Sequence, residues 1–299
     1  MGDWLISLEG TVAGERLALI LALQAAFLHA LFGALQKRVT DPWTARAVID
    51  ATYAAMAAPF ALLMFPDAPG DLWPLLAIMI VIHIGYKCSQ SAAYSAGAYT
   101  VVYPVVRGMG PVFTVFAAGL VFGEHFSAVQ WLGVGALLAG ILGLALYNLR
   151  HIEVDRAYLP LALGLAVLTG GFVAAYTTFD AYLIRAFDNP LAFLAWFFFL
   201  DGLTFPLVGL IRRRGSLPRP IARHAILGVQ GAVTAIFSFG GILLATRLDK
   251  VGEAAVLRET SVVFAALIGW LMLGEKVGPR RLSLMALIAA GAVIVEVGG

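Results

Sequence analysis

The chain consists almost entirely of long apolar segments separated by short turns, and this pattern restricts what it can fold into. A helix needs about 20 apolar residues to cross the roughly 30 Å hydrocarbon core of a bilayer. The breaks between segments carry turn residues, as in PDAPGD at 66–71 and RRRGSLPRP at 212–220. We therefore predict an all-α integral membrane protein with ten transmembrane helices, over residues 16–37, 43–65, 72–96, 99–122, 126–148, 159–186, 190–212, 222–246, 251–273 and 278–297.

The composition supports a bilayer environment. Hydrophobic residues make up 61% of the chain and charged residues 13%, whereas soluble domains carry about 45–50% and about 25%. The net charge of +2 gives no reason to expect a nucleic-acid partner. Cys88 is the single cysteine, so neither a disulfide framework nor a thiol metal site is expected. We expect no cofactor.

Lysine and arginine residues are distributed unevenly between the loops on the two sides. Thirteen lie on the side away from the N-terminus and four on the N-terminal side. Cytoplasmic loops carry the excess of these residues, so the bias predicts that both termini lie outside. We expect a multi-pass protein of the inner (plasma) membrane.

The second half of the chain repeats the first at a nearly constant offset. Arg107 and Arg258 lie 151 positions apart, as do Glu124 and Glu275. This pattern predicts two five-helix repeats, at 1–150 and 151–299. Because five is odd, the second repeat enters from the opposite face, which gives a 5+5 inverted repeat. Such repeats commonly enclose a central cavity near the bilayer midplane.

Several motifs resemble those of a known family. They are Pro104 and Pro111, the FGE that ends at Glu124, the glycines of 133–143 and the LGE that ends at Glu275. Together with two five-helix halves, they resemble the drug/metabolite transporter (DMT) superfamily, in its EamA-type ten-helix exporter branch. The resemblance implies export of amino acids or other metabolites through a cavity lined by spans 1, 3, 4, 6, 8 and 9. It also implies cytoplasmic termini, the opposite of what the loop charges predict.

Polar residues within the spans recur at helical spacing and are expected to face the interior. Three stripes are His83, Lys87, Gln90 and Tyr94; Tyr99, Tyr103 and Arg107; and Gln230, Thr234 and Ser238. To these we add His29, Tyr86, Tyr176 and Arg258 as residues of the cavity or of substrate binding. His29 and His83 could carry protons or form neutral hydrogen bonds. Lys87 could attract an anion or balance a carboxylate.

The intramembrane arginines need partners, because an unpaired charge at that depth is costly. Depth along the spans pairs Arg107 with Asp50 and Arg258 with Asp180, and Asp201 and Glu259 are further candidates. We expect both guanidinium groups to point inward, within hydrogen-bonding reach of a carboxylate or a backbone carbonyl.

No motif for catalysis is present in the sequence, which favours a transporter over an enzyme, a channel or a structural protein. Aromatic walls with cationic groups suit small amphipathic metabolites such as amino acids or organic anions. We predict a secondary active transporter, an exporter, working by alternating access. Alternatives are an exchanger of phosphorylated or nucleotide-linked solutes and a broad-specificity drug exporter. Expected partners are the small-molecule substrate and the lipid bilayer; a proton or counter-substrate, and a monomer or weak homodimer, stay open.

Overall fold

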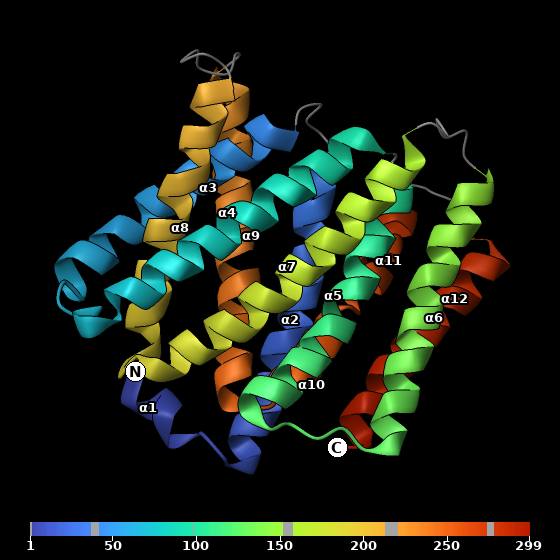
Figure 1. Cartoon of the computed structure of the whole chain (residues 1–299), viewed down its shortest axis with the longest axis horizontal. Helices are drawn as coiled ribbons and strands as arrows, with labels where there is room; N and C mark the ends of the chain where they lie inside the picture. The colour runs from blue at the N-terminus through green and yellow to red at the C-terminus, as the bar shows by residue number, and fades with distance from the viewer. Residues whose placement is uncertain (1, 37–41, 98, 152–157, 213–220, 274–277) are drawn as a thin grey trace.

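The computed structural model describes residues 2–36, 42–97, 99–151, 158–212, 221–273 and 278–299 (Figure 1). Over these residues the fold is helical throughout, without strands. The first half contains α1 (Gly2–Ser7), α2 (Val12–Gln36), α3 (Pro42–Pro59), the π-helix η1 (Phe60–Met64), the 3₁₀-helix η2 (Gly70–Leu72), α4 (Trp73–Ala96), α5 (Tyr99–Phe122) and α6 (Ala128–His151). The second half contains α7 (Leu159–Ala186), α8 (Pro190–Arg212), α9 (Ile221–Leu248), α10 (Val251–Arg258), α11 (Ser261–Leu273) and α12 (Pro279–Val297).

Among the described residues, 8 helical stretches are long and apolar enough to cross a membrane. They correspond to the first eight predicted spans. The ninth predicted span is divided between two shorter helices, and the tenth carries Arg280, Arg281 and Glu296 within the 19 residues of α12. The predicted count of ten is therefore not confirmed, although α10, α11 and α12 occupy the expected stretch of sequence.

The break in the ninth predicted span lies at Glu259 and Thr260, between α10 and α11. Thr260 Oγ1 donates to the carbonyl of Leu257 at 2.7 Å. Short hydroxyl side chains compete in this way with the backbone for hydrogen bonds and favour turns. The interruption frees the carbonyl of Arg258, which accepts a bond from Arg107 Nη2 at 3.3 Å. The helix break thus places polar backbone where an arginine of α5 can use it.

The aromatic run 196–200 of α8 packs inside the protein. Trp196, Phe197 and Phe198 are buried in a core cluster with residues of α3, α4 and α9. Trp196 Nε1 donates to the carbonyl of Phe65, just after η1, at 2.8 Å. Since α3 and α8 pack on each other along their lengths, this cluster fixes one wall of the centre of the molecule.

Helices α6 and α12 pack closely through small residues. A Cβ atom placed on Gly291 would lie 2.6 Å from the carbonyl oxygen of Gly133, and one on Gly140 would lie 2.6 Å from Ile288 Cγ1. Only glycine at these points allows such close approach. This pair lies at one side of the bundle in Figure 1, away from α3 and α8.

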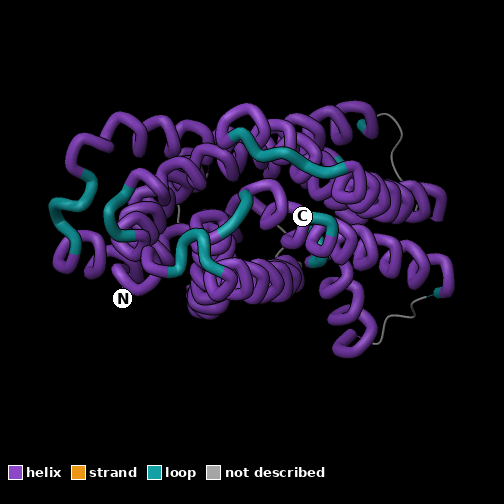
Figure 2. Tube along the Cα trace, turned by 90° about the horizontal axis from the view of Figure 1, so that it is seen from below, coloured by secondary structure: helices purple, strands orange, loops and turns teal. Residues whose placement is uncertain are grey.

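The remaining helices interleave the two halves of the chain. Helix α2 packs against α9, and α4 and α5 both pack against α7. Both termini lie at the lower end of the bundle in Figure 1, the end from which Figure 2 views it. The interleaving brings polar residues of eight helices to one central region.

Candidate substrate cavity

A cavity lies between α2, α3, α4, α5, α7, α8, α9 and α10. It offers about 70 Å³ to the centres of water-sized molecules, which is room for several waters. It is lined by His29, Phe32, Arg46, Tyr53, His83, Tyr86, Gln90, Tyr94, Tyr103, Tyr176, Phe197, Phe198, Asp201, Ala235, Ser238, Phe239, Ile242 and Arg258. Both halves of the chain therefore contribute to one central cavity with a polar and aromatic wall.

Most predicted cavity residues lie on this wall. They are His29, His83, Tyr86, Gln90, Tyr94, Tyr103, Tyr176, Ser238 and Arg258. Gln90 Nε2 donates to the hydroxyl of Tyr86 at 2.7 Å, and Ser238 Oγ donates to the carbonyl of Ala25 at 2.8 Å.

Four predicted residues do not line the cavity. Lys87 and Arg107 are buried in ion pairs beside it. Thr234 bonds to carbonyls of its own helix, and Gln230 is exposed. Residues four and eight positions before Ser238 are rotated from it by about 40° and about 80° around a helix of 3.6 residues per turn, so that stripe drifts off the face. The side chain of Tyr99 lies outside the part of the chain that the structure describes.

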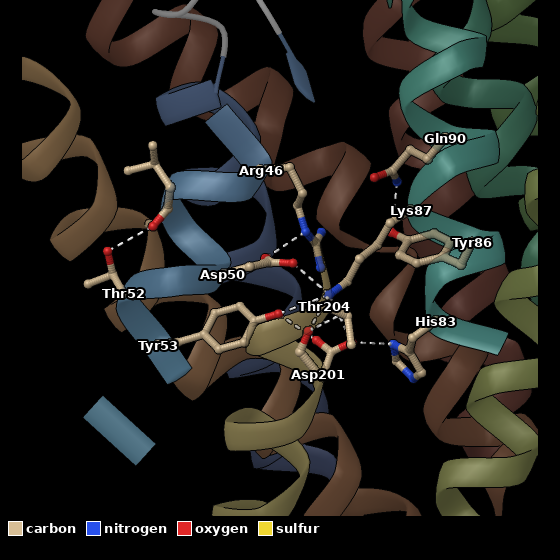
Figure 3. Close-up of polar contacts among 12 residues, drawn as sticks. Arg46, Asp50, Thr52, Tyr53, His83, Tyr86, Lys87, Gln90, Asp201 and Thr204 are labelled. Atoms are coloured by element: carbon tan, nitrogen blue, oxygen red, sulfur yellow. Dashed lines mark hydrogen bonds and ion pairs between the residues drawn. The ribbon is translucent and has the colours of Figure 1, made fainter. Parts of the chain in front are cut away.

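One wall of the cavity contains a chain of alternating charges from α3, α4 and α8 (Figure 3). Arg46 Nε lies 2.8 Å from Asp50 Oδ1, and Lys87 Nζ lies 2.6 Å from Asp50 Oδ2. The same ammonium lies 2.8 Å from Asp201 Oδ1, and the hydroxyl of Tyr53 donates to Asp201 Oδ2. Since Lys87 is fully buried between two carboxylates, it balances them.

His83 extends this chain to α7. Its Nε2 lies 2.8 Å from Asp180 Oδ2, and its Nδ1 lies 3.5 Å from Asp201 Oδ1. The rings of Tyr176 and Phe197 flank the imidazole at 5.0 and 5.1 Å between centroids. Within the described residues, no group of three or more His, Cys, Asp or Glu side chains is arranged to hold a metal ion.

Arg107 is held by a second polar group, built around the break between α10 and α11. Its Nε lies 2.7 Å from Glu259 Oε2, and its Nη2 donates to Ser261 Oγ at 3.0 Å. Its Nη1 lies 3.3 Å from His29 Nε2. The predicted pairing with Asp50 is wrong, because equal depth in the bilayer does not imply lateral proximity of the helices.

Arg258 differs from its repeat mate Arg107. It lines the cavity with 3% of its surface exposed. The predicted partner Asp180 is bound to His83 instead, and the nearest described carboxylate oxygen, Glu259 Oε1, lies 3.9 Å away. Nε and Nη2 of Arg258 have no hydrogen-bond partner among the described residues. The expectation of a hydrogen-bonded guanidinium is confirmed for Arg107 and wrong for these atoms of Arg258.

Two wall residues on α3, Arg46 and Tyr53, were missed by sequence reasoning. Arg46 is one of the thirteen lysine and arginine residues assigned above to loops on the side away from the N-terminus, but it lies inside α3 beside Asp50. Positions 46, 50 and 53 have the spacing i, i+4, i+7, the same signal that identified the stripe on α4. Applying that criterion near the span ends would have found them.

The sequence also matches a known protein family over nearly its full length. A model of the EamA-like transporter family matches residues 16–146 and again 160–297. The chain belongs to the EamA-like transporter family. The EamA family is part of the DMT superfamily, and its members are transporters. With its apolar helices, this EamA chain is a multi-pass membrane protein of the DMT transporter type.

The fold of this EamA chain also occurs among solved structures. One solved structure, described as "Crystal structure of protein", is 17% identical, with a TM-score of 0.74 over 94% of this chain and 96% of that chain. At this identity the similarity shows the fold alone. Among curated proteins, none matches the chain.

Proposed function

We propose that this EamA protein is a secondary active transporter that exports small amphipathic metabolites by alternating access, without catalysis. The observation that carries the proposal is the central cavity between eight helices of both halves, with aromatic walls and Arg258 on its surface. Such a cavity can hold a small solute between the two halves of the chain. Rearrangement of one half against the other would open it to either side.

Helix packing supports the proposed 5+5 inverted repeat, with repeats at 1–150 and 151–299. Exchanging the halves converts the α2–α9 contact into α7–α4, and the α5–α7 contact into that of α10 and α11 with α2; all are among the contacts of the fold. The α3–α8 and α6–α12 contacts map onto themselves. In this scheme α10 and α11 are the two parts of a discontinuous ninth span, and α12 is the tenth. Broken helices of this kind border the binding site in many secondary transporters.

Glu259 has the position of a gate carboxylate. It lies 2.7 Å from the nearest nitrogen of Arg107 and 3.9 Å from that of Arg258. In the state described, Glu259 neutralises Arg107, and Arg258 lines the cavity. A shift of Glu259 toward Arg258 in the opposite-facing state would compete with a bound anion and promote its release.

The charge pattern bears on the alternative functions. A cationic drug would require an unpaired acid on the wall, whereas ion pairs occupy Asp50, Asp201 and Glu259 and a hydrogen bond with His83 occupies Asp180. An exchanger of phosphorylated or nucleotide-linked solutes remains the second candidate, because arginine also binds phosphate.

We place the protein in the inner (plasma) membrane. The driving species would be a proton or a counter-substrate.

Flux through purified protein tests the proposal. The protein is reconstituted into vesicles, and uptake of labelled amino acids, organic acids and phosphorylated metabolites is measured without ATP. We expect at least one solute to enter at a rate that saturates with concentration and exceeds that of protein-free vesicles. The proposal fails if flux of every solute stays linear in concentration, or if the protein chemically converts the solute.

A further inference from the structure

Four cationic side chains surround the cavity, and they differ in how they are neutralised. Arg46, Lys87 and Arg107 each lie within 2.8 Å of a carboxylate oxygen. Arg258 has no described carboxylate oxygen nearer than 3.9 Å, and that oxygen belongs to Glu259, which is already bound to Arg107. Arg258 thus brings a positive charge to the cavity wall without a close counterion among the described residues.

We propose that Arg258 binds the carboxylate of the transported solute, and that this solute is a monoanionic organic acid with an apolar or aromatic body. The proposal rests on the proposed function and narrows its substrate class. A guanidinium is always charged and presents its N–H donors in a planar fork that matches a carboxylate. Nε and Nη2 of Arg258, which can form one two-pronged edge of that fork, are both buried and have no hydrogen-bond partner among the described residues.

Among the described residues around the cavity, Arg258 is the one cation with no carboxylate oxygen nearer than 3.9 Å, which favours a solute with one negative charge over a solute with two. A phosphate dianion would need a second cation, but Lys87 lies between two carboxylates and Arg107 is bound to Glu259. Recruiting either would leave a buried carboxylate unpaired, which is strongly unfavourable. A monoanion satisfies Arg258 without disturbing the other pairs.

The acidic groups argue against a zwitterion such as an amino acid. Asp201 is the one carboxylate among the described lining residues, and it already binds Lys87 and the hydroxyl of Tyr53. An ammonium group would find no free carboxylate there. The rest of the solute meets aromatic rings, including Tyr86 and Tyr176, whose centroids lie 4.8 Å apart. These walls suit an apolar body.

Four probes with a common phenyl group separate charge from shape. They are hydrocinnamate, its neutral amide hydrocinnamide, zwitterionic phenylalanine, and phenyl phosphate as the dianion. Equilibrium binding to the purified full chain is measured in detergent at neutral pH. We expect hydrocinnamate to bind about 10- to 100-fold more tightly than each of the other three, the range for hydrogen bonds to a charged group.

Variants then assign the preference to Arg258. Arg258→Gln should bind hydrocinnamate and hydrocinnamide equally, and Arg258→Lys should keep part of the preference, since it keeps the charge but not the fork. Gln230→Ala, which alters an exposed polar side chain of α9, is the matched control and should bind as the unaltered protein does. If neither Arg258 variant stays monodisperse, the ranking of probes by the unaltered protein decides.

The outcomes that overturn the anion site are separate from those that overturn transport. Equal binding of acid and amide, tightest binding of phenylalanine or phenyl phosphate, or an unchanged preference in Arg258→Gln each overturns the Arg258 proposal. If the amide also crosses vesicles saturably while the acid does not, the transporter stands and the anion site falls. Absence of saturable flux for any solute overturns the proposed function itself.

Discussion

Replacing Lys87 by methionine tests the buried charge chain of the cavity wall. Methionine preserves much of the side-chain volume but removes the ammonium that bonds Asp50 at 2.6 Å and Asp201 at 2.8 Å. Asp50 retains Arg46 at 2.8 Å, whereas Asp201 retains only the longer contact to His83 and the hydroxyl of Tyr53. Breaking a buried ion pair by removing one partner costs about 3–5 kcal/mol, and we expect a loss of free energy of unfolding in that range.

The assay is reversible unfolding in mixed micelles, compared with the double variant Lys87→Met/Asp201→Asn. The double variant removes one charge of each sign and leaves the Arg46–Asp50 and His83–Asp180 pairs intact. The double variant should therefore lose less free energy of unfolding than the two single variants lose in sum, by about 1–3 kcal/mol. Strictly additive losses, or a Lys87→Met cost below about 1 kcal/mol, would refute the coupled ion pairs.

Three further substitutions test other parts of the structure. Glu124→Ala removes the carboxylate that accepts the first two backbone N–H groups of α10 at 2.6 and 2.9 Å, and should cost about 1–2 kcal/mol of unfolding free energy; an unchanged value contradicts this cap. Gly291→Ala places a Cβ 2.6 Å from backbone of α6 and should cost about 1–3 kcal/mol in the same assay. Its control Gly135→Ala meets nothing within 4 Å and should be neutral or slightly stabilising; equal effects would disprove the close α6–α12 packing. Glu259→Gln leaves Arg107 without its counterion and should cost about 3 kcal/mol, while hydrocinnamate binding is retained; loss of binding would show that Glu259, not Arg258, supports the anion.

The apolar segments identified the first eight spans, because helix length and turn chemistry are local properties of the sequence. The break at Glu259 and Thr260 was not predicted. The mean hydropathy of 251–273 stays high despite these two polar residues, so the segment was read as one continuous span. What stabilises the break is tertiary: Arg107, on α5, bonds to Glu259 and to the carbonyl of Arg258. The sequence of one segment does not show which residue of another helix will contact it.

The cavity wall could be predicted where polar residues follow one face of a helix. His83, Gln90 and Tyr94 on α4 all line the cavity. Glu259 was a candidate partner for the arginines and does pair with Arg107. The pairs between α3, α4 and α8 were not predicted, because depth in the sequence orders residues along the membrane normal only. Asp50 pairs with Arg46 one turn away on α3, a spacing that the sequence does show. Its pairing with Lys87 depends on the contact of α3 with α4 in the bundle. Which helices lie side by side in the bilayer depends on tertiary packing, and neither the composition nor the spacing of residues determines that packing.

Counterflow in vesicles tests alternating access most directly. Purified protein is reconstituted with a high internal concentration of unlabelled solute, using the solute with saturable uptake, and the external solution holds a trace of the labelled form. A carrier returns loaded from each crossing, so we predict transient accumulation of label above its external concentration, without ATP and absent from protein-free vesicles. A channel only equilibrates the label. Simple equilibration, with no overshoot at any internal concentration, would contradict transport by alternating access.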